Sequence, residues 1–181
     1  MKHIKVACRQ SASFARSIIF TGHMESGKEN PMKTAIGLAR KGLNANAGGP
    51  FGCEVVKDGK IVGRGSNSVT STNDPTAHAE VVAIREACKN LNDFQLTGCE
   101  IYTSCEPCPM CMAAIYWARP DKVFYANSKK DAAEIGFDDN FIYEELALSY
   151  ADRNIPMLRM MDKEALAAFK EWASKSDKIE Y

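Results

Sequence analysis

Residues 75–80 read Pro-Thr-Ala-His-Ala-Glu, and residues 107–111 read Pro-Cys-Pro-Met-Cys. Each stretch opens a segment with helical spacing, which predicts one helix over 77–91 and another over 109–119. Short β-type runs at 100–103 and 122–126 flank the second helix. Because two strands joined by a helix run parallel, this part of the chain predicts a parallel strand pair with a helix packed on it.

The remaining segments extend the same alternation. Strands at 53–56 and 61–62 are joined by Asp58-Gly59, a strong hairpin signal. The other predicted elements are a helix over 32–43, a short helix over 130–135, a last strand over 156–161 and an amphipathic helix over 162–174. Together they predict a single α/β domain with a largely parallel sheet that one hairpin opens.

Length and composition bound the class of protein. The chain has 181 residues, 45% of them hydrophobic and 25% charged, which is typical of one soluble globular domain. No apolar stretch approaches the ~18 residues of a membrane span, so a transmembrane protein is excluded. Lysine plus arginine and aspartate plus glutamate each total 23, and this balance argues against nucleic-acid binding.

Two further features of the sequence concern its compartment and its start. Seven cysteines, an odd number, without a secretory signal indicate reduced thiols and a cytoplasmic location. Residues 1–31 are basic at first and carry no acid before Glu25. They predict an N-terminal extension ahead of a domain over 32–181, and a leader, a cloning remnant or a late natural start all fit it.

Metal-ligand spacing points to the chemistry. Of the three histidines, His3 and His23 lie in the extension, so a metal in the domain must use His78. Cys108 and Cys111 open a helix, where backbone N–H groups and the helix dipole lower thiol pKa values. A neutral histidine nitrogen and two thiolates leave a fourth tetrahedral position for water, as a catalytic zinc site requires. We therefore expect one Zn²⁺ per chain.

Glu80 is the residue that distinguishes a catalytic zinc site from a structural one, because a purely structural site does not need this carboxylate. Positions 78 and 80 do not share a helix face, but in a first turn both side chains can converge beyond the helix end. Glu80 would then act as general base and general acid. Cys105-x-x-Cys108 also has ligand spacing, so a closed structural site with Cys105 as fourth ligand is an alternative.

These motifs, H-x-E followed by P-C-x-x-C, resemble the cytidine deaminase-like superfamily of zinc nucleobase deaminases. More narrowly, the chain is similar to its bacterial guanine deaminases over about residues 32–181. The resemblance also covers the stretches 48–52, 73–80, 102–111, 114–120 and 136–139 and the terminal Tyr181.

The resemblance implies a fold, a reaction and an assembly. The fold is a three-layer α/β/α sandwich around a five-stranded mixed sheet, and the reaction is hydrolysis of guanine to xanthine and ammonia. The assembly is a homodimer that exchanges its C-terminal segments. The resemblance further implies that Asp139 contacts the substrate and assists proton transfer. It also implies that the substrate-binding residues are Asn67, Phe51, Ala79, Trp117 and Tyr181.

Other functions compete with this interpretation. They are deamination of a related base or nucleoside such as cytosine or guanosine, deamination of adenosine in tRNA, and a structural zinc module without catalysis. By their residue types alone, Phe51 and Trp117 also fit a plain core, Asn67 a turn, Asp139 a helix cap and Tyr181 a frayed end.

Overall fold

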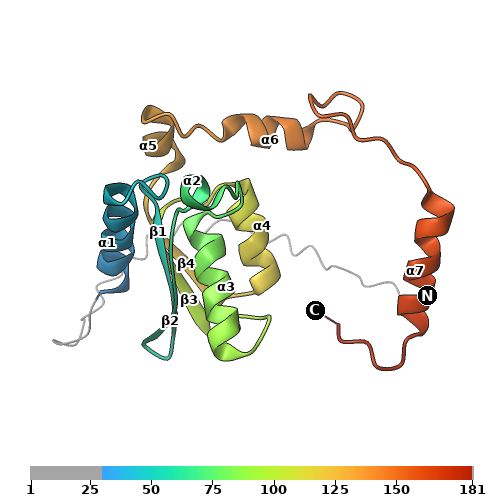
Figure 1. Ribbon diagram of the computed structural model, residues 1–181, viewed down its shortest axis with the longest axis horizontal. Coiled ribbons are helices and arrows are strands. Elements are labelled where there is room, and N and C mark those ends of the chain that lie inside the picture. Colours follow the sequence, from blue (N-terminus) through green and yellow to red (C-terminus); the bar gives the residue numbers. More distant parts are fainter. Residues whose placement is uncertain (1–29, 181) are drawn as a thin grey trace, which may run out of the picture.

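The computed structural model describes residues 30–180, and residues 1–29 and 181 lie outside this part (Figure 1). Helix α1 (Pro31–Asn44) begins the described chain, with Asn30 as its N-cap: the Oδ1 atom accepts a hydrogen bond from the Met32 N–H at 3.0 Å. Almost all of the predicted extension 1–31 therefore lies outside the described residues, and its status stays a prediction.

Four described strands form one sheet in the order β2-β1-β3-β4. The strands are β1 (Gly52–Lys57), β2 (Lys60–Ser66), β3 (Cys99–Cys105) and β4 (Lys122–Asn127). The hairpin of β1 with β2 and the parallel pair of β3 with β4 confirm the predictions. However, β1 and β3 are antiparallel, so the expectation of a largely parallel sheet is wrong, whereas the mixed sheet that the resemblance implies is confirmed. The reason is that a helical crossover makes β3 parallel to β2, and β1 lies antiparallel between them.

Six further helices complete the described chain. They are α2 (Val69–Thr72), α3 (Ala79–Leu91), α4 (Pro109–Ala118), α5 (Lys129–Glu134), α6 (Asn140–Ala147) and α7 (Asp162–Ser174). The predicted helices correspond to α1, α3, α4, α5 and α7. Helices α2 and α6 are not predicted: α2 is a single turn of valine, serine and threonine, which are weak helix formers.

The sheet is covered on both faces. Helix α1 packs on one face, whereas α3 and α4 lie on the other (Figure 1), which confirms the three-layer arrangement. Two glycines allow the close approach: a Cβ on Gly52 would lie 2.2 Å from the Ala35 carbonyl oxygen, and one on Gly65 2.0 Å from that of Ala79. The core between the sheet and α3 and α4 includes Cys53, Val55, Ala83, Leu96, Cys99, Ile101 and Ile115.

The C-terminal segment differs from its prediction. Residues 156–161 form no strand, so the described sheet has four strands instead of five, and β4 is one of its two edges. After α5 the chain leaves the sheet, and α6 and α7 extend away from the body (Figure 1). A strand needs a pairing partner, and here Leu158 is 87% exposed. Among the described helices, none combines the length and the apolar character needed to cross a bilayer.

Candidate active site

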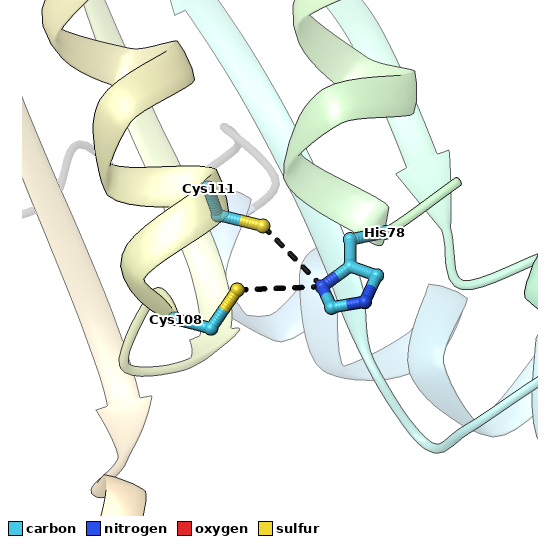
Figure 2. Close-up of side chains that lie close together, drawn as sticks. All are labelled: His78, Cys108 and Cys111. Carbon is cyan, nitrogen blue, oxygen red and sulfur yellow. Dashed lines mark hydrogen bonds between the residues drawn. The ribbon is translucent and has the colours of Figure 1, made fainter. Parts of the chain in front are cut away.

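Two helix starts face each other and carry the predicted ligands (Figure 2). His78 is the N-cap of α3 and Cys108 is the N-cap of α4, and neither side chain makes a capping hydrogen bond. Cys111 follows in the first turn of α4, where Pro109 occupies the first position. The N-cap side chains, which elsewhere satisfy helix N–H groups, are thus free to bind a metal.

The distances between these side chains suit a tetrahedral ion. Nδ1 of His78 lies 3.6 Å from Sγ of Cys108 and 3.4 Å from Sγ of Cys111 (Figure 2), and the three atoms all lie within 4.8 Å of one another. A zinc ion about 2.3 Å from a sulfur and about 2.05 Å from a nitrogen, with tetrahedral angles, sets the two ligands about 3.6 Å apart. The three side chains therefore can hold one zinc ion, with Nδ1 as the histidine ligand.

The protonation of the two thiols also favours a cation. A hydrogen bond from Cys111, together with His78, lowers the pKa of Cys108 to about 4. Sharing a proton with Cys108 and burial raise the pKa of Cys111. The metal-free pair thus carries one thiolate and one thiol proton. Cys111 would release that proton on binding a zinc ion, because both sulfurs would bind the ion as thiolates.

Cys105 lies outside this ligand cluster. It lines the same cavity, but its Sγ donates to the Ser128 carbonyl oxygen at 3.6 Å, and burial raises its pKa to about 11. Within the described residues, the group able to hold a metal consists of His78, Cys108 and Cys111. The geometry therefore favours an open three-ligand site over the closed four-ligand alternative.

Glu80 lies beside the ligands and is almost completely buried, at 5% exposure. Its Oε1 accepts a hydrogen bond from the Thr103 hydroxyl at 3.1 Å, and its Oε2 accepts one from Cys111 Sγ at 3.4 Å. Burial raises the pKa of this carboxyl group. The structure thus places Glu80 beside His78, Cys108 and Cys111. The sequence predicts this arrangement, because His78 and Glu80 both lie at the start of a helix.

A cavity of about 740 Å³ opens beside these groups, within the usual range for small-molecule sites. His78, Glu80 and Cys108 are among the residues that line it. Phe51 and Phe137 line a wall, with ring centroids 5.0 Å apart and planes at 89°. This pair places an aromatic surface where a flat ring could pack.

Asn67 lines the cavity with a fixed amide. Its Oδ1 accepts hydrogen bonds from the Gly49 N–H at 3.2 Å and the Val69 N–H at 3.3 Å. Gly48 permits this, since a Cβ there would lie 2.1 Å from the same oxygen. With the oxygen held by the backbone, the two amide hydrogens are the part of Asn67 that a ligand can use.

Asp139 also lines the cavity, and its side chain is available for the site. It occupies the N-cap position of α6 without making a capping hydrogen bond, while Asp138 accepts from the Asn140 N–H at 2.9 Å. Burial raises the pKa of Asp139, and the nearby Lys129 ammonium opposes this effect. Lys129 in turn lies 4.5 Å over the Tyr143 ring, which links α5 to α6.

Of the predicted residues that the structure describes, Ala79 and Trp117 are not brought into the cavity. Ala79 is buried as the first residue of α3, and only its backbone N–H, which has no acceptor within the helix, could serve a ligand. Trp117 is 65% exposed on α4 and is absent from the cavity wall of its own chain. Tyr181 lies outside the described residues, so its role stays a prediction.

Two residues of the site were missed by sequence reasoning. Thr103 lies on the same face of β3 as Ile101, and this period of two is the signal that it faces the helix-covered core. Phe137 follows Gly136, which has a φ of 90°, and that turn carries the ring to Phe51. An aromatic residue between a glycine and two aspartates was the available hint.

Comparison with known proteins gives concordant results. Residues 25–127 match the family of the cytidine and deoxycytidylate deaminase zinc-binding region. The chain is 55% identical to guanine deaminase of Bacillus subtilis over 153 residues, which is 84% of this chain and 98% of that protein. The crystal structure of guanine deaminase from Bacillus subtilis superposes with a TM-score of 0.81 over 83% of this chain and 96% of that one.

A second group of relatives shares a smaller part of the chain. The tRNA-specific adenosine deaminase of Aquifex aeolicus is 43% identical over 100 residues, which is 55% of this chain and 66% of that protein.

The family match covers more than half of the chain and includes His78, Glu80, Cys108 and Cys111. The chain therefore belongs to the zinc-binding cytidine and deoxycytidylate deaminase family.

Proposed function

We propose that this protein is a zinc-dependent guanine deaminase. In this reaction guanine and water give xanthine and ammonia. The observation that carries the proposal is the 55% identity to a guanine deaminase over 98% of that protein's length, in a chain that keeps the ligand set and Glu80 in place.

The cavity offers groups that complement guanine. The rings of Phe51 and Phe137 suit a flat purine. The amide hydrogens of Asn67 suit the O6 and N7 acceptors of the base. Asp139 suits its N–H and amino donors, which cytosine and adenine present differently. A site built on such hydrogen bonds rejects analogues that leave its polar groups unpaired.

Each residue of the site then has its own part in the reaction. His78, Cys108 and Cys111 would hold a zinc ion, which supplies the Lewis acidity that makes water nucleophilic near neutral pH. As water adds to C2 of guanine, Glu80 accepts its proton and passes it to the ring nitrogen N3. Glu80 then passes the second proton of this oxygen to the amino group, which leaves as ammonia. Asp139 holds the amino side of the base during these transfers.

The experiment that tests the function measures ammonia and product. The zinc-loaded protein is incubated separately with guanine, guanosine, cytosine, adenine and a short adenosine-containing RNA. We expect ammonia and xanthine from guanine. Turnover of each of the other compounds should be at least about 100-fold lower, because they leave polar groups of the site unpaired. Preferred turnover of guanosine, cytosine or the RNA would instead identify one of the alternative deaminases, and no turnover of any would indicate a structural zinc module.

We further propose that the functional form is a homodimer that exchanges its C-terminal segments. Helix α7 carries Leu166, Phe169 and Trp172 along one stripe, and Phe169 is 74% exposed. A helix of this length is only marginally stable in water without packing. A second copy of the chain can accept this stripe and can pair residues 156–161 with the free edge of β4.

The exchange would also complete the site. Tyr102 and Phe124 stack at 4.8 Å on β3 and β4, on the sheet face that α1 shares, and offer an apolar surface beside that edge. A segment seated there would carry its own Tyr181 toward the cavity of the other chain as a lid. The six described cysteines are free, which fits a reducing cytoplasm and a site built of thiolates.

The assembly is tested by light scattering after size-exclusion chromatography. We expect wild-type protein at twice the 19.9 kDa chain mass. Phe169→Lys should raise the dimer dissociation constant by roughly 100-fold or more. The dimer loses one buried phenylalanine side chain from each copy, and burying each one contributes about 1.5–3 kcal/mol. Glu171→Lys, on the opposite face of α7, is the matched control and should remain dimeric. A monomeric wild type at micromolar concentration would contradict the exchange.

A further inference from the structure

Thr103 is a buried hydroxyl residue with a partner in the active site. It lies in the middle of the sheet on β3, between Cys53 of β1 and Tyr125 of β4, and it is fully buried. Its side chain is on the sheet face toward α3, where Oγ1 donates to Oε1 of Glu80 at 3.1 Å. A rigid central strand thus holds one oxygen of a carboxylate that belongs to a helix start.

The two oxygens of Glu80 have different surroundings. Oε1 is occupied by the Thr103 hydroxyl, whereas Oε2 lies 3.4 Å from Cys111 Sγ, which itself lies 3.4 Å from Nδ1 of His78. Oε2 is therefore the oxygen on the side of the ligand cluster. A free glutamate has three side-chain torsions and could rotate either oxygen away from that direction.

We propose that Thr103 is the positioning residue of Glu80: its hydroxyl fixes Oε1 so that Oε2 is the oxygen that exchanges protons with water and substrate. This role rests on the proposed deaminase function. It is compatible with both protonation states, since Oε1 can accept the Thr103 hydrogen bond whether or not Oε2 carries a proton. The carboxyl group then keeps one orientation through successive transfers, which a reaction with several proton transfers requires.

The neighbouring residue provides a comparison within the same strand. Ser104 is also a buried hydroxyl of β3, but its Oγ accepts a hydrogen bond from the Gly52 backbone N–H at 3.0 Å. Ser104 thus binds the backbone of β1, whereas Thr103 binds the side chain of Glu80, which lines the cavity. Removing each hydroxyl separates a general loss of stability from a loss of positioning.

The test uses zinc-loaded full-length variants with guanine. Thr103→Val keeps the side-chain shape and removes the donor. We expect kcat to fall about 10- to 100-fold, the range of a hydrogen bond to a charged group, with KM within about threefold. Zinc content and the dissociation constant of xanthine should match wild type. Thr103→Ser should recover most of kcat, and Thr103→Cys, a weaker donor, should fall between the serine and valine variants.

Two further arms make the result decisive. Ser104→Ala should lower the thermal midpoint but leave kcat within about threefold of wild type, because its hydroxyl does not touch Glu80. In a Glu80→Gln background, Thr103→Val should cause no further loss of kcat, since both changes act through one group. A valine variant with wild-type kcat, or equal losses in Thr103→Val and Ser104→Ala, would overturn the role of Thr103 alone. A wild type that releases no ammonia from guanine would overturn the deaminase function itself.

Discussion

Glu80→Gln is expected to keep the fold and the zinc ion and to lose nearly all turnover of guanine. The amide has the same shape and can still accept the Thr103 hydrogen bond at Oε1. It cannot accept a proton from water, so general acid–base catalysis is lost, which alone contributes about 10²- to 10⁴-fold. Because one carboxyl group serves several transfers here, we expect a loss of kcat at the upper end of that range.

The measurement is steady-state ammonia release together with metal analysis of the same preparation. Glu86→Gln is the matched control, because Glu86 lies on the same helix α3 and its carboxylate accepts from the Arg64 backbone N–H, away from the cavity. This control should retain activity close to wild type. If Glu80→Gln kept more than about a tenth of the wild-type rate with full zinc content, Glu80 would not be the proton carrier.

Much of this site could be predicted because its signals are local in sequence. His78 and Glu80 lie two residues apart, and Cys108 and Cys111 lie three apart, each pair at a helix start. Helix starts can be predicted from capping residues and proline, and ligand spacing can be counted directly. The sequence could therefore predict which side chains converge, before any long-range contact was known.

The contacts that sequence reasoning missed depend on distant pairings. Thr103 reaches Glu80 only because the sheet brings the end of β3 to the start of α3, which packs on β2 and β1. Phe137 reaches Phe51 across a long separation in sequence. Only the family resemblance identifies Asn67 and Asp139 as site residues, since their residue types equally fit a turn and a cap. Pairings of this kind leave no local pattern.

The predicted strand over 156–161 illustrates the same limit. Its apolar pattern fits a strand, but a pattern does not specify where the pairing edge lies, and within one chain the segment stays unpaired. The antiparallel pair of β1 and β3 arises in the same way, from the path of the crossover. Local periodicity therefore predicts which segments form helices and strands better than it predicts which strands pair with one another.

Cys108→Ser and Cys105→Ser should differ sharply in zinc content, although both residues line the cavity. Cys108 Sγ lies 3.6 Å from His78 Nδ1, whereas Cys105 Sγ is engaged by the Ser128 carbonyl oxygen. Structural zinc sites bind with about 10–16 kcal/mol over four ligands, so one lost ligand should weaken binding by roughly 100-fold or more. We therefore expect Cys108→Ser to lose zinc and all measurable turnover, and Cys105→Ser to retain one zinc per chain.

Metal analysis after dialysis against a competing chelator distinguishes the two variants. Zinc retention should also fall as the pH falls, because Cys111, whose pKa is raised in the metal-free pair, must release its proton to bind the ion. The open site requires that His78, Cys108 and Cys111 suffice as protein ligands, with the fourth position facing the cavity and Glu80. If Cys105→Ser lost zinc as readily as Cys108→Ser, the site would have four protein ligands, no position would remain for water, and the catalytic assignment of Glu80 would fail with it.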